Sequence, residues 1–138
     1  MLVLSLTGHH ASSTEPETKQ SLASVEATFN HDYQVNDDGP VWDRWDRASQ
    51  AFITRSRYVL WHHECPNSPG AAVTGSVIHL SGPWWQVNYS ISGVALRDYW
   101  HQEHGQWRFS LVRSNPSAVA LYTSSFAHYA RATGCQAG

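Results

Sequence analysis

The stretch that decides the fold is "AAVTGSVIHLSGPWWQVNYSISGVALRDYWHQEHGQWRFSLVR", residues 71–113. It contains four β-branched and aromatic segments, 71–80, 84–92, 94–103 and 106–113, separated by short breaks that contain Gly, Ser or Pro. Runs of this composition between turn residues are typical of neighbouring strands in an antiparallel sheet. We therefore predict four antiparallel strands joined by tight turns.

Helical patterns lie on the N-terminal side of these strands. A first helix is predicted from Thr18 to the Gly39–Pro40 break, because apolar residues recur there at steps of three and four. Its apolar stripe consists of Leu22, Val25, Phe29 and Tyr33. A second, short helix is expected over 40–50 and a third over 55–64, with Thr54 as its cap.

One further helix is expected after the strands, within residues 117–134. Its apolar face consists of Val119, Tyr122, Phe126 and Tyr129. Three helices, a meander of strands and a last helix predict an α+β fold. Residues 18–138 are expected to form one domain, and the polar residues 1–17 a flexible N-terminal segment.

Composition excludes some classes of function. The formal net charge is −2 and there is no basic stripe, so a nucleic-acid surface is not expected. No apolar run is long enough to span a membrane. The seven tryptophans and six tyrosines either fill the core or line a ligand cavity.

The N-terminus and the two cysteines bear on location. "LSLTG", residues 4–8, looks like the end of a lipoprotein signal, but His9 stands where such a signal has its lipid-bearing cysteine. We expect a cytoplasmic protein, with an exported protein as the alternative. Cys65 and Cys135 would pair in an oxidising compartment and stay free in the cytoplasm, and the sequence leaves both open.

The order of parts, with "HHECP" at 62–66 and "EHGQWRF" at 103–109, resembles the nuclear transport factor 2-like superfamily. That group includes ketosteroid isomerase-like and polyketide cyclase-like members, and the nearest likeness is to small exported actinobacterial lipoproteins. The resemblance covers about residues 18–113. It implies a curved sheet wrapped on a long helix, with a conical pocket between them. No catalytic signature of the group matches this sequence residue by residue, and the C-terminal helix is an addition.

Asp98 is the first candidate for chemistry. Alternate residues of a strand share a face, and the neighbours of Asp98 on its face are Val94, Leu96 and Trp100. A carboxyl group buried among apolar residues has a raised pKa, which suits it to proton transfer near neutral pH. The alternatives are that an arginine pairs with Asp98 or that it faces solvent.

The same test on the other strands predicts an aromatic cavity. One face carries Val73, Val77 and His79 on the first strand, Trp85 to Ile91 in alternation on the second, and Trp107, Phe109 and Leu111 on the last. We predict Asp98, His79 and Tyr89 as catalytic residues, although His79 at a strand end also fits a purely structural role. The expected ligand contacts are Tyr33, Tyr58, Trp61, Trp85, Trp100 and Trp107.

No metal or cofactor is expected. His62 and Cys65 have no second pair at ligand spacing, and His101 and His104 do not share a strand face. No nucleophile elbow is present, so nucleophilic catalysis is not expected.

Two functions remain open. One is a cofactor-independent cyclase, isomerase or lyase acting on a hydrophobic polyketide- or terpenoid-like molecule. The other is a non-catalytic, exported ligand- or partner-binding protein descended from a lipoprotein. A homodimer through the sheet is a further prediction.

Overall fold

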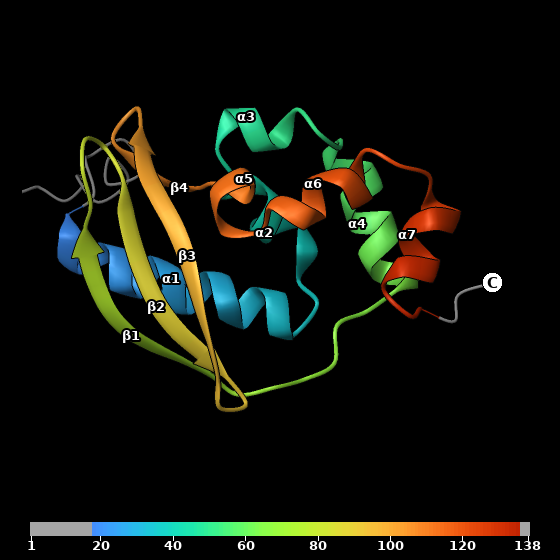
Figure 1. The fold of residues 1–138 in the computed structure, drawn as a ribbon, viewed down its shortest axis with the longest axis horizontal. Coiled ribbons are helices and arrows are strands. Elements are labelled where there is room, and N and C mark those ends of the chain that lie inside the picture. Colours follow the sequence, from blue (N-terminus) through green and yellow to red (C-terminus); the bar gives the residue numbers. More distant parts are fainter. Residues whose placement is uncertain (1–17, 136–138) are drawn as a thin grey trace, which may run out of the picture.

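The computed structural model describes residues 18–135, which form an α+β fold with one four-stranded antiparallel sheet (Figure 1). The expectations for residues 1–17 lie outside the described residues. Along the chain the elements are α1 (Lys19–Gln34), α2 (Asp38–Asp43), α3 (Arg47–Gln50), α4 (Arg55–Glu64), β1 (Ala72–His79), β2 (Trp85–Ile91), β3 (Val94–Glu103), β4 (Gln106–Phe109), α5 (Leu111–Ser114), α6 (Pro116–Tyr122) and α7 (Phe126–Ala132). The strands lie in the order β1-β2-β3-β4, so the predicted meander is confirmed.

Two-residue turns join the longer strands. Ser92 and Gly93 connect β2 to β3, and His104 and Gly105 connect β3 to β4. All four residues have positive φ, between 51° and 82°. Two successive residues of positive φ match the right-handed twist of an antiparallel pair, and glycine adopts this conformation without strain.

A β-bulge in β1 changes one predicted face. The pairing of β1 with β2 shifts between Thr74 and Val77. The two residues inside the shift reverse the alternation, so Val77 packs against the core while Val73 is 62% exposed. The prediction that Val73 shares a face with Val77 is therefore wrong.

The fourth strand is shorter than predicted, because Ser110 begins a helix. Its Oγ accepts from the backbone N–H of Arg113, and Ser49 Oγ accepts from the N–H of Leu111. These two bonds replace the ladder that would have extended β4 to residue 113, and α5 forms instead.

Two predicted helices are interrupted. Helix 40–50 divides into α2 and α3 because the chain at Trp45 pairs with Phe109, and Asp46 then caps α3 through Ser49. The C-terminal helix expected within residues 117–134 divides into α6 and α7. Ser124 bonds back to the carbonyl of Leu121, and Ser125 caps α7 through the N–H of His128.

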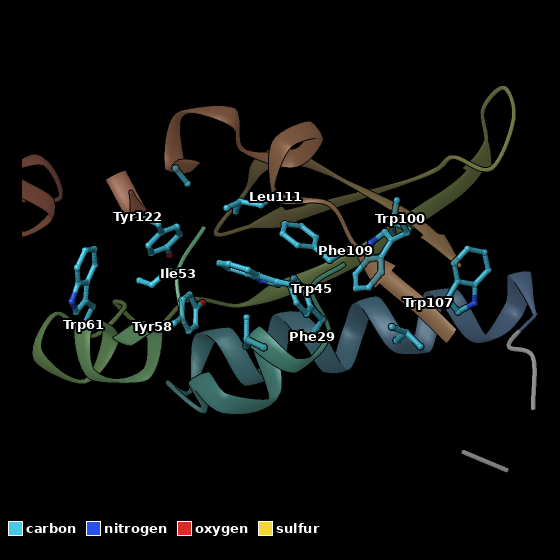
Figure 2. Close-up of a cluster of buried hydrophobic side chains, with 14 of the residues drawn as sticks. Phe29, Trp45, Ile53, Tyr58, Trp61, Trp100, Trp107, Phe109, Leu111 and Tyr122 are labelled. Carbon is cyan, nitrogen blue, oxygen red and sulfur yellow. The ribbon is translucent and has the colours of Figure 1, made fainter. Parts of the chain in front are cut away.

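The core lies between α1 and the sheet and continues into the remaining helices (Figures 1 and 2). Leu22, Val25 and Phe29 of α1 are buried, as the stripe predicted. At the far end of the helical part, a Cys65–Cys135 disulfide joins the end of α4 to the end of α7, with Cα atoms 5.4 Å apart. None of the helices within residues 18–135 is long and apolar enough to cross a membrane.

Candidate active site

A cavity of about 640 Å³ lies where α1, the sheet and α6 meet. Its aromatic lining includes five rings from α1, α4, β4, α6 and the segment at Trp45, namely Phe29, Tyr58, Phe109, Tyr122 and Trp45. Figure 2 shows these five rings between Trp61 at one end of the cluster and Trp107 at the other. The polar lining includes Asn30, Tyr33, Tyr89, Arg97, Asp98 and Arg113.

Two carboxyl groups meet at the wall of this cavity. Asp98 of β3 lines the cavity and is 5% exposed, and Glu26 of α1 is fully buried behind it. Trp100 Nε1 donates to Glu26 Oε1 at 3.2 Å, and Asn30 Nδ2 donates to Glu26 Oε2 at 3.0 Å. Asp98 in turn is hydrogen-bonded to Glu26 and Tyr89.

The environment of the pair favours protonation. Burial, and then the negative charge of Asp98, raise the pKa of Glu26 well above its usual value. Burial also raises the pKa of Asp98, to about 6, although hydrogen bonds with Glu26 and Tyr89 oppose the rise. No Arg or His within residues 18–135 forms an ion pair with either group. At neutral pH the arrangement therefore holds one proton, with protonated Glu26 donating to ionised Asp98.

Two tyrosines, Tyr89 and Tyr33, lie close enough to this pair for its negative charge to change their pKa values. Burial raises the pKa of Tyr89, and the charges of Asp98 and Glu26 raise it further. Burial likewise raises the pKa of Tyr33, with smaller contributions from Asp38 and Asp98. Both phenols therefore stay protonated and serve as hydrogen-bond donors in the cavity.

Four of the residues expected at the site line the cavity. Asp98 is buried on the core face, as its strand alternation predicted, and Tyr89 lies near it. Tyr33 reaches the cavity from α1 and Tyr58 from α4. Their roles in binding or catalysis stay predictions.

His79 does not lie at the cavity, contrary to the expectation. It is exposed at the end of β1, where its Nε2 lies 2.9 Å from the carbonyl oxygen of Gly82. Its ring stacks on Trp85 with centroids 4.3 Å apart. The face assignment was correct, but the strand end extends past the part of the sheet that closes on the cavity.

Four tryptophans expected as ligand contacts pack elsewhere. Trp100 and Trp107 are buried in the core, and Trp85 packs edge-on against Trp107 with centroids 5.8 Å apart. Trp61 is covered by α7, where Tyr129 lies 5.1 Å from it. None of the four is part of the cavity lining. The sequence predicted large apolar side chains correctly, but not which of them the short helices would cover.

Glu26 was missed, although the sequence contained a signal for it. It stands four residues after Leu22 and three before Phe29, so it falls on the apolar stripe of α1. A carboxyl group at such a position needs a partner on the opposing sheet. The same test that selected Asp98 on β3 selects Glu26 on α1.

A second polar cluster, formed by Asp46, His101 and Glu103, lies outside the cavity lining. His101 Nε2 lies 2.8 Å from Asp46 Oδ2 and 3.9 Å from Glu103 Oε2. One ligand atom from each residue lies within 4.8 Å of the others, which is close enough for a metal ion. Burial alone would raise the pKa of Asp46, but hydrogen bonds with His101 and Ser49 outweigh this and lower it. The contacts make this cluster a link between β3 and α3.

No protein-family model, curated protein or solved structure matches this chain.

Proposed function

We propose that the protein is a cofactor-independent acid–base enzyme of the cyclase, isomerase or lyase type. Its substrate would be a hydrophobic molecule of polyketide or terpenoid kind held in the aromatic cavity. The observation that carries the proposal is the position of Asp98, a carboxyl group on the cavity wall backed by the buried carboxyl group of Glu26. Two hydrogen-bonded carboxyl groups with raised pKa values keep one exchangeable proton between them, beside the space for the ligand.

The pair supports proton transfer in both directions. Ionised Asp98 accepts a proton from carbon or oxygen of the bound molecule, and Glu26, already protonated, relieves the repulsion between the two groups. Asp98 returns the proton at another atom of the same molecule. Because its pKa is about 6, Asp98 is mostly ionised at pH 7 and still basic enough to accept a proton. Tyr33 supplies a hydrogen bond to a polar atom of the ligand, while the hydroxyl of Tyr89 donates to Asp98.

The cavity suits a molecule of two to four fused rings. Its volume of about 640 Å³ falls within the range of small-molecule sites, roughly 300–1,000 Å³. Aromatic walls hold a flat apolar body by burial and ring contacts, which fixes the reacting atom beside Asp98 without a cofactor.

Solvent exchange of ligand C–H bonds tests this function without knowledge of the natural reaction. The protein is incubated in D₂O with 2-tetralone and its hydroxylated analogues, and deuterium uptake at carbon is followed by NMR. We expect uptake in wild-type protein and a loss of roughly 10²–10⁴-fold in Asp98→Asn. His79→Gln is the matched control and should exchange at the wild-type rate. Tight binding with no exchange above buffer would reject the enzyme and favour a binding protein.

That alternative, an exported non-catalytic ligand-binding protein, has one observation in its favour. The Cys65–Cys135 disulfide closes the helical end of the domain. Such bonds persist in oxidising compartments and are rare in the cytoplasm. The disulfide thus favours an exported protein over the cytoplasmic location expected from the sequence, and it is compatible with either function.

We also propose that the chain is a distant member of the nuclear transport factor 2-like superfamily, with a conical pocket. The long helix α1 against a four-stranded meander supports this. A homodimer through the outer sheet face is a further proposal, supported by exposed Val73 and Ile78 on that face. Sedimentation analysis of wild type against Val73→Lys tests the dimer, which should be lost in the variant.

A further inference from the structure

A second buried polar group lies behind the cavity wall formed by Tyr58 and Tyr122. His62 of α4 is 1% exposed and Asp38 of α2 is 5% exposed. His62 Nε2 lies 2.7 Å from the hydroxyl of Tyr122 and 3.3 Å from that of Tyr129. Tyr122 lines the cavity, so one side of this group reaches the ligand space.

The other ring nitrogen of His62 has no hydrogen-bond partner. Its Nδ1 and Asp38 Oδ1 lie 3.9 Å apart, and both are buried without a hydrogen-bond partner. A buried polar atom without a hydrogen-bond partner lowers the stability of the fold. A histidine needed only to hold Tyr122 would not require a carboxylate on its far side. The three residues instead follow one another in the order Asp38, His62, Tyr122, and Tyr122 is the member that lines the cavity.

We propose that Tyr122, His62 and Asp38 form a proton relay that is the second acid–base site of the cavity, and that it acts on a hydroxyl group of the bound molecule. Tyr122 touches the ligand, while His62 and Asp38 position and support it. The ligand O–H bond breaks, its proton moves to the Tyr122 oxygen, and the Tyr122 proton moves to His62 Nε2. The imidazolium so formed faces Asp38, and the proton returns by the reverse path.

The protonation states are consistent with this direction. Burial lowers the pKa of His62 to about 4, so the imidazole is neutral and Nε2 is free to accept. Burial and the neighbouring Asp37 raise the pKa of Asp38 to about 6, while His63 opposes the rise, so Asp38 is mostly ionised at pH 7. Tyr58 and Tyr129 are held protonated by burial and surround the relay with neutral donors. The relay requires the tautomer that carries its hydrogen on Nδ1, the nitrogen that faces Asp38.

The relay also predicts that the substrate carries a reacting group at each of its two ends. Figure 2 places Tyr58 and Tyr122 toward one end of the aromatic cluster and Trp100, the partner of Glu26, toward the other. A molecule in the cavity would therefore place a hydroxyl group at Tyr122 and its proton-exchanging carbon at Asp98. This inference uses the proposed function to describe the substrate, but its test does not depend on turnover.

Two measurements test the relay. The ¹⁵N shifts of the His62 ring in wild-type protein at pH 7 should show the Nδ1–H tautomer, and an Nε2–H tautomer would overturn the proposal. The second measurement is labelling by an arylsulfonyl fluoride, followed by mass spectrometry. The Tyr122 oxygen attacks sulfur, the S–F bond breaks, fluoride leaves, and His62 takes the tyrosine proton.

Labelling should concentrate on Tyr122, and His62→Gln should slow it by roughly 10²-fold. Tyr58 is the internal control, because it lines the same cavity. If Tyr58 reacts as fast as Tyr122, or if folded His62→Gln labels at the wild-type rate, the relay is rejected. If His62→Gln does not fold, the labelling rate of Asp38→Asn and the His62 ring tautomer in wild-type protein test the relay instead. His79 lies outside the cavity, so His79→Gln should label at the wild-type rate. Labelling requires no turnover, so failure of the relay and failure of the proposed enzyme are read separately.

Discussion

The indole N–H of Trp100 donates to Glu26 Oε1 over 3.2 Å, and this bond ties β3 to α1 inside the core. Both residues are fully buried. Asp98 lies two residues before Trp100 on the same face of β3. The link therefore holds the Glu26 carboxyl group at a fixed position behind Asp98. The geometry of the candidate acid pair therefore depends on a residue that does not touch the cavity.

Replacing Trp100 with phenylalanine should weaken the fold and disturb the pair. Glu26 Oε1 loses its indole donor, and a buried acceptor without a partner costs about 1–3 kcal/mol. The smaller ring leaves a void that adds to this loss. Urea denaturation at pH 7 measures the free energy of unfolding. Trp107→Phe is the control, because its indole N–H donates to the backbone carbonyl of exposed Thr18. Equal losses in the two variants would mean that the Glu26 link contributes nothing of its own.

Asp98→Asn should change how stability depends on pH. The folded-state pKa of Asp98 is about 6, above its unfolded value near 4. Between these values the unfolded chain releases the Asp98 proton while the folded protein keeps it, so wild-type stability falls as pH rises. Asparagine has no such proton. We therefore expect the variant to gain stability relative to wild type from about pH 4 to pH 6.

The comparison must be between the two proteins at each pH, because other groups titrate in the same window. His62 has a lowered pKa, so it contributes stability that increases as pH rises. Asp38 contributes in the same direction as Asp98. Both are present in wild type and variant, and their effects cancel in the difference. The difference therefore reports Asp98 together with Glu26, whose pKa the charge of Asp98 raises. A difference in unfolding free energy that stays constant from pH 4 to pH 7 would show that Asp98 is not buried as an acid.

Removing the disulfide should lower stability by about 4 kcal/mol, because Cys65 and Cys135 close a loop of 70 residues. The measurement is denaturant unfolding of the Cys65→Ser, Cys135→Ser double variant beside oxidised wild type. Reductant should lower the stability of wild type and leave the double variant unchanged. A thiol assay on unreduced, denatured wild type should find no free thiol, and two free thiols would contradict the bond.

Local patterns in the sequence predicted the strands and two of the helices, α1 and α4, well. Helix α4 begins and ends as expected because Thr54 caps it and Cys65–Pro66 follows it. The breaks in the other helices depended on contacts far apart in the chain, such as Trp45 with Phe109. Local periodicity carries no information about such pairs, which is why the second helix and the C-terminal helix were drawn too long.

For the same reason, the sequence predicted only one of the two carboxyl groups of the candidate site. Alternation along one strand selected Asp98, since a carboxyl group among apolar neighbours is visible in the sequence alone. Its partner Glu26 lies 72 positions earlier, and the relay of Asp38, His62 and Tyr122 spans three helices. Their proximity depends on how α1, α2, α4 and α6 pack, which side-chain spacing within one helix does not specify.

Filling the cavity should abolish ligand binding without unfolding the protein. Ala118 of α6 is buried and lines the cavity, while Ala120 on the same helix is exposed. A phenylalanine at position 118 extends into the open volume of about 640 Å³. It should therefore lower the free energy of unfolding by less than the roughly 1–3 kcal/mol that a larger side chain costs in a packed core. We expect Ala118→Phe to bind 2-tetralone analogues at least roughly tenfold more weakly, a loss of about 1.4 kcal/mol. Ala120→Phe should bind as wild type does. Quenching of tryptophan fluorescence reports binding, because Trp45 lines the cavity. Unchanged affinity in Ala118→Phe would place the ligand outside this cavity.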